Sequence, residues 1–419
     1  MSNRFKNTLY TLGDYKRVGR HIRYVTNEDG TLFSEDMPLT APAAGVVKSM
    51  CLHISHDCNM RCRYCFAGTG DFHRGRKLMS YEMGCKAIDF LLEKSGYIKN
   101  LELDFFGGEP LLNFDVVKRL VAYGREAEKP LGKNIRFTIT TNGALLDDDA
   151  IAFINENRSN AVLSVDGRKC VNDGMRTFVD GSGTYDTIIP SYKKLVKDRT
   201  ADWYVRGTYT RENTDFSEDV LSLANEGFDQ ISVEPVVLDN DDPLSIREED
   251  LPKLFAEYEK LAAEMAKRIT RDPATVEEPG KNGRFNFFHF MVDLDAGPCV
   301  YKRVKGCGSG SEYVAITPDG DIYPCHQFVG YTEFKMGNIV TGEFNRDIQK
   351  QFAGNSIVSM PHCQKCWAKY FCGGGCAANN YKFHKDLTVP YTIACELEKK
   401  RVECALMLKA AEAEAEADE

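Results

Sequence analysis

The sequence lacks the long apolar run that a membrane-spanning helix needs, and it lacks a secretory signal. No apolar stretch approaches the roughly 18 residues required to cross a bilayer, and the mean hydropathy is −0.37. The N-terminal stretch MSNRFKNTLYTLGDYKR carries charges but lacks the apolar core that a secretory signal peptide has. These absences exclude an integral membrane protein and predict a cytoplasmic location.

The sequence also lacks an excess of positive charge and any internal repeat. Lys and Arg number 53 against 62 Asp and Glu, which leaves a net charge of −9 and disfavours binding along a nucleic acid backbone. No period of about 20 to 50 residues indicates a solenoid. With 43% hydrophobic and 27% charged residues, the chain has the composition of a folded protein rather than a disordered one.

Cysteine, in contrast, is plentiful. The chain has 15 cysteines, and most of them stand in clusters. A secreted domain would use cysteines as disulfide staples, but no export signal is visible. Clustered cysteines in such a chain indicate a metal-binding protein or a redox enzyme.

Strand and helix patterns alternate from residue 46 onward. Six stretches have strand character: 47–55, 101–106, 135–143, 161–167, 203–210 and 230–237. Helical spacing occurs over 80–96, with Ser80 as its N-cap, and over 114–128, 147–157, 184–198 and 217–227. Strands that alternate with helices predict a parallel sheet with right-handed crossovers. We therefore expect an α/β fold, a partial (β/α)6 TIM-like barrel.

Changes in composition suggest five segments. Residues 1–45 form a short N-terminal segment, and 46–240 form the barrel. Residues 241–296 form a bridge with one strong helix over 247–270, and 297–406 form a cysteine-rich domain in which Pro318-Asp319-Gly320 is a hairpin turn. Residues 407–419 are an acidic, solvated tail.

The first cysteine cluster is CNMRCRYC, in which Cys58, Cys62 and Cys65 have the spacing C-x3-C-x2-C. Three thiolates on one loop can hold three irons of a [4Fe-4S] cluster and leave the fourth iron open to an amine and a carboxylate. A zinc site is the alternative, but it normally has four ligands in paired C-x2-C units. The neighbouring His53 and His56 are interpreted as strand and loop residues rather than ligands.

The triplet after the first strand resembles the radical S-adenosylmethionine (SAM) enzymes. The resemblance implies that these three cysteines are catalytic, because the open iron binds SAM and its cleavage yields a 5′-deoxyadenosyl radical. Three further positions resemble SAM-binding motifs of that family. Gly107-Gly108-Glu109-Pro110 matches the motif for the amino group, Ser164 and Arg176 match the carboxylate pair, and Tyr64 matches the aromatic position near the adenine.

A second set of cysteines follows in the C-terminal part. Cys363, Cys366, Cys372 and Cys376 have the spacing C-x2-C-x5-C-x3-C, with Cys395 beyond them, and Cys307 precedes Gly320-x4-Cys325. Zinc knuckles are the alternative, since C-x2-C is common in zinc sites.

This second pattern resembles the SPASM domain, which binds two auxiliary [4Fe-4S] clusters. The resemblance assigns Cys307, Cys325 and Cys376 to one cluster and Cys363, Cys366, Cys372 and Cys395 to the other, so that three clusters are expected in all. Cys299 is a candidate fourth ligand of the first auxiliary cluster. An iron left open there suits a substrate thiolate.

The similarity extends to a narrower group. CLHISHDCNMRCRYCFAGTGDF, LDFFGGEPLLNFDVVKRLV and CWAKYFCGGGCAANNY resemble the SCIFF maturases, which act on ribosomal peptides with six cysteines. That resemblance implies thioether bonds between cysteine sulfur and an acceptor carbon, often of threonine. The partners would be a cysteine-rich precursor peptide and an electron donor such as flavodoxin or ferredoxin, with no nucleic acid or membrane.

Two features depart from that pattern. Residues 1–45 are too short for the winged-helix domain that grips a leader peptide, and we interpret them as its remnant. Anaerobic sulfatase maturases, the alternative within the fold, carry an acid directly after the cysteine matching Cys325, where this chain has His326. The remaining Cys51, Cys85, Cys170 and Cys404 are expected to be small buried hydrophobic residues.

Overall fold

The computed structural model describes residues 46–239, 241–269, 283–292 and 304–418, and the two short strands β1 (Val25–Thr26) and β2 (Leu32–Phe33). The rest of the expected N-terminal segment, part of the expected bridge and Cys299 lie outside the described residues. No helix in the described ranges combines the length and the apolar character that a membrane span requires.

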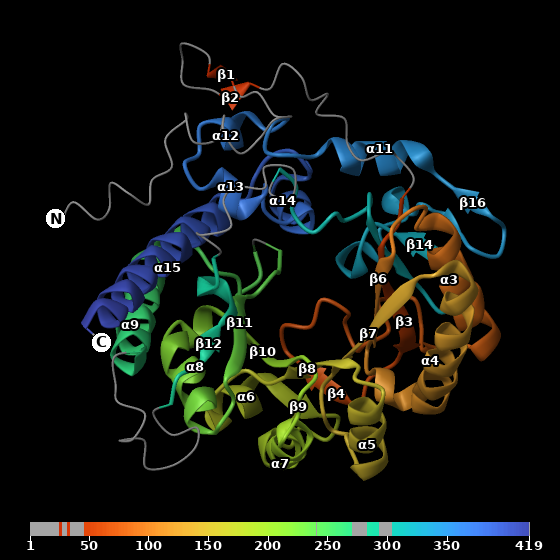
Figure 1. Ribbon diagram of the computed structural model, residues 1–419, viewed down its shortest axis with the longest axis horizontal. Coiled ribbons are helices and arrows are strands. Elements are labelled where there is room, and N and C mark those ends of the chain that lie inside the picture. The colour runs from red at the N-terminus through yellow and green to blue at the C-terminus, as the bar shows by residue number, and fades with distance from the viewer. Residues whose placement is uncertain are drawn as a thin grey trace.

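A partial β/α barrel organises the N-terminal half. Its strands are β3 (Ser49–His56), β6 (Asn100–Gly107), β7 (Asn134–Thr141), β8 (Asn160–Ser164), β10 (Trp203–Tyr209) and β11 (Gln230–Pro235). They pair in parallel, in chain order. Figure 1 shows the strands curving into an open ring with helices outside it. The six strands and the barrel predicted from the sequence are confirmed.

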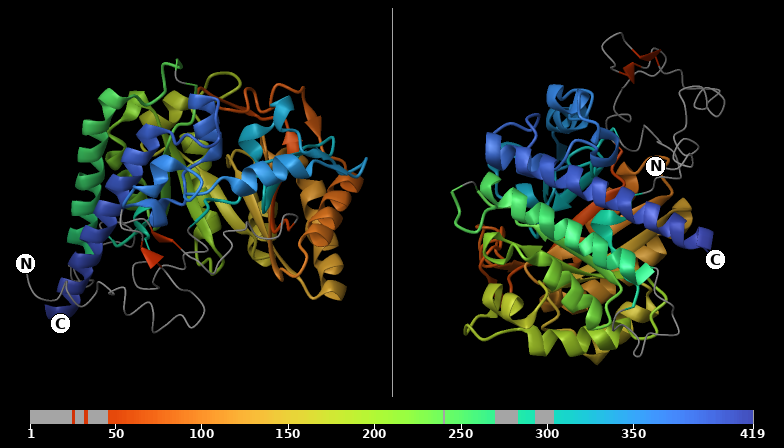
Figure 2. Two further views of the ribbon diagram at one scale, coloured as in Figure 1. Left: turned by 90° about the horizontal axis from the view of Figure 1, so that it is seen from above. Right: turned by 90° about the vertical axis from the view of Figure 1, so that its left-hand side faces the viewer.

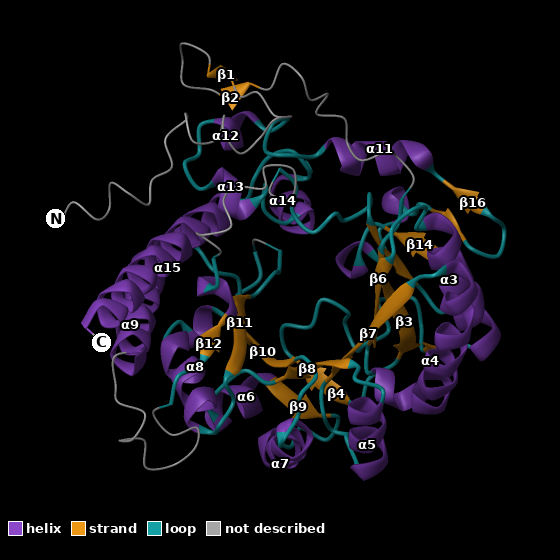
Figure 3. Cartoon of the chain, in the orientation of Figure 1, coloured by secondary structure: helices purple, strands orange, loops and turns teal. Residues whose placement is uncertain are grey.

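Helices cover the outer face of this ring (Figure 3). They are α3 (Tyr81–Lys94), α4 (Phe114–Glu128), α5 (Asp148–Glu156), α6 (Lys169–Met175), α7 (Tyr185–Val196) and α8 (Phe216–Asn225). The predicted cap of the first helix is confirmed, since Ser80 accepts a hydrogen bond from the Met83 N–H at 3.1 Å. Alternate residues of β6, Leu101, Leu103 and Phe105, are fully buried in the main core. Their neighbours therefore face the inside of the ring.

The C-terminal region continues the same sheet. Strand β13 (Tyr313–Ile316) pairs in parallel with β3, at the edge of the barrel, and β14 (Asp321–Tyr323), β15 (Gly337–Asn338) and β16 (Glu343–Phe344) follow in antiparallel pairing. The predicted hairpin turn lies between β13 and β14, with Gly320 at φ +80°. At the other edge, β12 (Asn286–Phe287) pairs in parallel with β11.

Short helices and two long ones complete the fold. The short helices α11 (Arg346–Gly354), α12 (Pro361–Gln364), α13 (Lys369–Cys372) and α14 (Ala377–His384) lie across the opening of the ring in Figure 1. The long helices α9 (Leu251–Ile269) and α15 (Thr392–Asp418) lie side by side, as the views of Figure 2 show. The acidic tail is thus the end of α15, which continues through residue 418 as one helix.

Candidate active site

The first cysteine cluster lies on the loop that leaves β3. The loop contains the short strand β4 (Met60–Cys62) and a turn in which the Cys65 N–H donates to the Cys62 carbonyl at 3.1 Å. Cys58, Cys62 and Cys65 are half-buried, and we call them the first thiol group. Burial raises the pKa of Cys58 to about 11 and of Cys62 to about 12. Without a cation the thiols are therefore protonated, and a bound metal would favour the thiolates.

An antiparallel pair that the sequence did not predict fixes this loop. Strand β4 pairs with β9 (Arg176–Phe178), so that Cys62 stands opposite Arg176. The Arg176 guanidinium donates to the Tyr64 hydroxyl at 2.9 Å, and that hydroxyl donates to the Asp166 carboxylate at 2.8 Å. The backbone thus brings Tyr64 and Arg176 beside the first thiol group, as the resemblance implied.

The Arg176 side chain is buried, and its Nε has no hydrogen-bond partner in the described part of the chain. A buried donor without a partner is costly, and a carboxylate is the group that an arginine fork binds best. The residues therefore fit the carboxylate of SAM. Ser164 lies at the end of β8, two residues before Asp166, and its carbonyl accepts from Tyr192 at 3.0 Å.

Glu109 occupies the other side of the loop and is completely buried. Its carboxylate accepts from the Leu111 N–H at 3.0 Å, from the Thr141 hydroxyl at 2.8 Å and from the Asn142 N–H at 2.7 Å. Burial raises the pKa of Glu109 to about 7, although these hydrogen bonds act in the opposite direction. A carboxylate has roughly four acceptor sites. One site therefore remains for an ammonium group such as that of SAM.

The glycines before Glu109 allow two loops to approach closely. Gly107 has φ +130°, and a Cβ built on it would lie 2.1 Å from the Ser55 carbonyl oxygen. A Cβ on Gly108 would lie 2.2 Å from the Asp57 carbonyl oxygen. The Glu109 loop is thus pressed against the residues that lead directly into Cys58.

Three residues near this site were missed by the sequence analysis. Asn142 follows β7 and donates from its side chain to Cys58 Sγ at 3.6 Å and to Asn59 at 2.8 Å. Thr141 holds Glu109, and Asp166 holds Tyr64. Each of them stands at the carboxyl end of a predicted strand, which is where sites collect in such folds. Their position at the ends of predicted strands was the sequence signal that could have identified these three residues.

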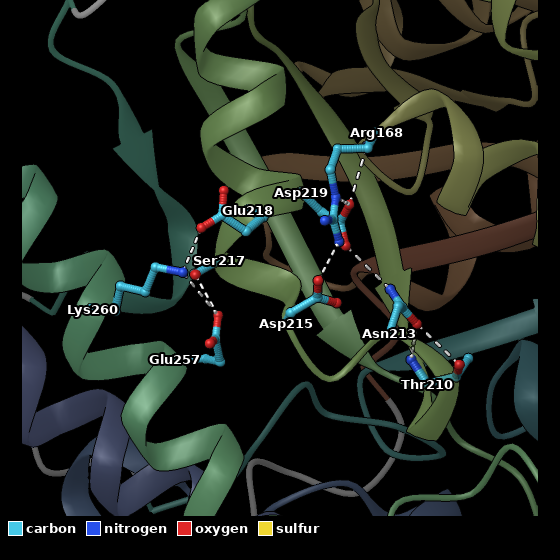
Figure 4. A network of polar contacts seen from close by, with 9 residues as sticks. All are labelled: Arg168, Thr210, Asn213, Asp215, Ser217, Glu218, Asp219, Glu257 and Lys260. Atoms are coloured by element: carbon cyan, nitrogen blue, oxygen red, sulfur yellow. Dashed lines mark hydrogen bonds and ion pairs between the residues drawn. The ribbon is translucent and has the colours of Figure 1, made fainter.

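A network of charges braces the turn after β8 (Figure 4). The Arg168 Nε and N–H donate to the buried Asp219 carboxylate of α8 at 2.7 and 3.1 Å, and its Nη2 donates to Asp215 at 2.9 Å. A Cβ on Gly167, which has φ +121°, would lie 2.2 Å from the Asp219 Cβ. On the outer side of α8, Lys260 pairs with Glu218. Gly167 and Arg168, which follow β8, are therefore held against α8.

The second thiol group is Cys307, Cys325 and Cys376. These residues come from the loop before β13, the end of β14 and the start of α14. Burial and the neighbouring Cys376 and Cys307 thiols together raise the pKa of Cys325 to about 12. The structure thus brings these three thiols together.

The third thiol group is Cys363, Cys366, Cys372 and Cys395, from α12, the loop after it, α13 and the first turn of α15. Burial and the other three thiols raise the pKa of Cys395 to about 12. Both groupings are those that the resemblance implied, and ligation of iron by them stays a prediction. In the described ranges, no three His, Cys, Asp or Glu side chains converge as ligands of a single metal ion; the thiolates of an iron–sulfur cluster each bind a different iron and stand further apart.

Of the four remaining cysteines, Cys51 and Cys404 are buried, as expected, and Cys85 is half-buried. The expectation for Cys170 is wrong, because this residue is exposed. It lies in the first turn of α6, a helix of seven residues on the outer surface of the barrel. The sequence pattern did not show which face of so short a helix is covered.

Two models of known protein families match parts of this chain. A model of the radical SAM superfamily matches residues 52–198, and a model of the SPASM iron–sulfur cluster-binding domain matches residues 307–367. The chain contains a radical SAM domain and a SPASM domain. These two domains imply bound SAM and iron–sulfur clusters.

Curated relatives share less than a third of the sequence. The chain is 25% identical over 340 residues to the cysteine-type anaerobic sulfatase-maturating enzyme of Clostridium novyi, covering 78% of this chain and 86% of that protein. It is 22% identical to the radical SAM cyclopropyl synthase TigE of Paramaledivibacter caminithermalis, covering 84% and 72%. An uncharacterised protein of Methanocaldococcus jannaschii, MJ0907, is 29% identical over 42% of this chain, and the match spans 57% of its own length.

Solved structures share the fold. Native anSMEcpe with bound AdoMet superposes with a TM-score of 0.70 at 18% identity, covering 88% of this chain and 100% of that one. Streptococcus suis SuiB bound to precursor peptide SuiA superposes with a TM-score of 0.57 at 19% identity, covering 83% and 76%.

Proposed function

We propose that the protein is a radical SAM peptide maturase that forms thioether crosslinks between cysteine sulfur and an acceptor carbon, often of threonine, in a ribosomal peptide with six cysteines. The first thiol group would hold the SAM-binding cluster, and the second and third would hold two auxiliary clusters. Residues 46–240 would form the radical SAM core, and 297–406 the SPASM domain. When bound, the first cluster and SAM supply a 5′-deoxyadenosyl radical that removes a hydrogen atom from the substrate.

The observation that carries this proposal is the position of the second thiol group at the barrel wall. Cys325 lies two residues after the end of β14, whose partner β13 is the neighbour of barrel strand β3. The Tyr313 side chain on β13 packs against both the hydrophobic cluster that contains Cys51 of β3 and the cluster that contains Cys325. A substrate thiol entering the barrel would therefore meet this group, and thiolate is a usual ligand of iron–sulfur clusters.

The described residues supply three thiols to this group. The fourth ligand would be Cys299, which lies outside them, or the substrate thiolate itself. The relatives support a peptide substrate, since anaerobic sulfatase-maturating enzymes, TigE and the peptide-bound SuiB are all among the similar proteins. We further propose a small electron donor, flavodoxin or ferredoxin, and a cytoplasmic location, where the free cysteines of the described ranges would stay reduced.

His326 distinguishes this proposal from sulfatase maturation. Its Nδ1 lies 3.2 Å from the Tyr313 hydroxyl, and its ring packs on Phe106 and Phe66 with centroid distances of 5.1 and 5.5 Å. The side chain after Cys325 is therefore held inside an aromatic layer. A free carboxylate is not present at this position.

Anaerobic assays with three peptide arms test the proposal. The reconstituted enzyme receives SAM, a reductant and a synthetic six-cysteine, threonine-containing peptide, a sulfatase peptide, or no peptide. We expect loss of two hydrogen atoms per bridge and one fewer alkylatable thiol in the first arm alone. Cys376→Ser should abolish the bridge, and Cys404→Ser, a buried cysteine outside the three groups, should retain it. Modification of the sulfatase peptide alone would refute the proposal.

A further inference from the structure

The inside of the barrel carries polar side chains that the SAM site does not use. On β6, Leu103 and Phe105 face the helices, so Asp104 between them faces inward. Strand register places it beside Cys51 of β3. Arg206 of β10 and Glu234 of β11 form an ion pair at 2.9 Å and keep 39% and 36% of their side-chain surface accessible. These two side chains therefore leave part of the lumen accessible to solvent.

Asp104 is held by a single type of contact. The Thr140 hydroxyl of β7 lies 3.0 Å from one carboxylate oxygen and 3.1 Å from the other. One hydroxyl has one proton to donate. Among the described residues no other hydrogen-bond donor reaches the Asp104 carboxylate, in contrast to Glu109, which accepts from three groups. The Asp104 carboxylate thus keeps acceptor capacity toward the lumen.

The charged and titratable groups around Asp104 come from four strands. Arg206 faces it from β10 and Glu102 from its own strand, and Cys51, Tyr204 and Tyr313 are also within electrostatic reach. Burial raises the pKa of Asp104 to about 7, Thr140 and Arg206 oppose this, and Glu102 adds to it. Arg206 is itself paired with Glu234, so Asp104 is not locked in its ionised form.

Asp104 also lies toward the second thiol group. The Tyr313 side chain packs against the cluster of Cys51, which stands opposite Asp104, and against the cluster of Cys325. Its hydroxyl contacts His326. The carboxylate and that thiol group therefore flank the same tyrosine. A substrate thiol bound between the second thiol group and the lumen would therefore lie near Asp104.

We propose that Asp104 is the proton acceptor for the substrate thiol during crosslinking. This inference rests on the proposed function. Joining carbon to sulfur breaks one C–H and one S–H bond and forms one C–S bond. The carbon would lose its hydrogen atom to the deoxyadenosyl radical, and the thiol proton would move to Asp104. The one remaining electron would pass to an iron–sulfur cluster, which balances the electron used to cleave SAM.

Two substitutions of Asp104 and one matched control test this role. Asp104→Asn removes the base, Asp104→Glu keeps a carboxylate, and Glu102→Gln changes an exposed acid two residues earlier on the same face of β6. Each holoenzyme is assayed with the six-cysteine, threonine-containing peptide from about pH 5 to 9. The readout is crosslinked peptide per 5′-deoxyadenosine formed.

We expect this ratio to fall at least about a hundredfold in Asp104→Asn while SAM cleavage persists. Asp104→Glu should restore most of it. Glu102→Gln should keep the parental ratio, with its pH dependence moved to slightly lower pH because Glu102 raises the Asp104 pKa. The parental ratio should rise as pH passes through the Asp104 pKa of about 7, and the Asn variant should lack that rise. Infrared difference spectra of the resting enzyme, parent minus Asp104→Asn, should show a protonated carboxyl that titrates near the same pH.

Retention of the ratio and of the pH profile in Asp104→Asn would overturn the inference. So would a loss that Asp104→Glu does not rescue, or an infrared difference without a titrating carboxyl. The proposed function fails in a separate way, if the parent gives a product without a thioether. In that case, the ratio of the non-thioether product to deoxyadenosine, compared between the parent and Asp104→Asn, would still show whether Asp104 accepts a proton from the substrate.

Discussion

Replacing Gly107 by alanine is the sharpest test of how the Glu109 loop is built. At φ +130° an alanine is strained by roughly 1–3 kcal/mol. Its Cβ would also lie 2.1 Å from the Ser55 carbonyl oxygen, where real contacts exceed about 3 Å. Relief of that overlap moves the strand end away from Ser55 and weakens the Gly108 N–H bond to the same oxygen, now 2.8 Å, for about 1 kcal/mol more. We expect a total loss of about 3 kcal/mol.

Gly132→Ala is the matched control. Gly132 also has positive φ, +61°, but a Cβ there meets no atom within 4 Å. Its cost is therefore the left-handed penalty alone, about 1–2 kcal/mol. Urea unfolding of the reconstituted proteins under anaerobic conditions compares the two, and equilibrium dialysis measures SAM binding.

Because Gly107 lies two residues before Glu109, Gly107→Ala should also weaken SAM binding at least about tenfold, which corresponds to 1.4 kcal/mol. Gly132→Ala should leave SAM binding unchanged. Gly132 follows the short helix η2 (Lys129–Leu131), which contributes no residue to the site. Equal stability of the two variants, or equal SAM affinity, would refute the reasoning.

Further expectations concern the metal content and the charged groups. Replacing the first thiol group by alanine should lower iron from about 12 to about 8 per chain, measured after reconstitution; a parent with about 4 iron and bound zinc would contradict three clusters. Arg176→Lys should weaken SAM binding at least about tenfold in dialysis, because lysine lacks the planar fork, whereas Lys118→Arg on α4 should not. The folded state favours neutral Asp104, since its pKa of about 7 exceeds the usual value. The contribution of the protonated Asp104 to stability is complete below about pH 4 and is lost as the pH rises to 7. In urea unfolding at pH 8, Asp104→Asn should therefore be more stable than the parent by at least about 1 kcal/mol. At pH 4 the two proteins should have the same stability.

The strands and helices of the barrel could be predicted because each follows from local pattern. The buried residues Leu101, Leu103 and Phe105 stand at every second position of β6. The Ser80 cap forms its hydrogen bond within the first turn of its own helix, so it can be predicted from neighbouring residues alone. The short strands β4 and β9 were missed because they have no such local pattern. Strand β4 has three residues and β9 has three, and neither has a hydrophobic period of its own. They exist because they pair with each other, across more than 100 residues of chain.

The cysteine groups could be anticipated from spacing and resemblance, but their surroundings could not. Asn142 and Asp166 stand at strand ends that were predicted, yet only the strand register shows that they meet Cys58 and Tyr64. Cys170 was misplaced since α6 is too short for its pattern to define a buried face. Long-range pairing and burial are decided by the tertiary fold, and one sequence carries little direct record of them.

The third thiol group shows how a distant helix completes such a site. Cys395 lies in the first turn of α15, after a long stretch of chain from Cys363. Later in the same helix, the Arg401 Nε donates to the Tyr258 hydroxyl of α9 at 2.9 Å, and Tyr258 contacts the Tyr209 hydroxyl of β10 at 3.1 Å. All three side chains are buried or nearly so. The position of Cys395 along α15 is therefore tied to the barrel, and the third thiol group is built against the same framework that carries the SAM site.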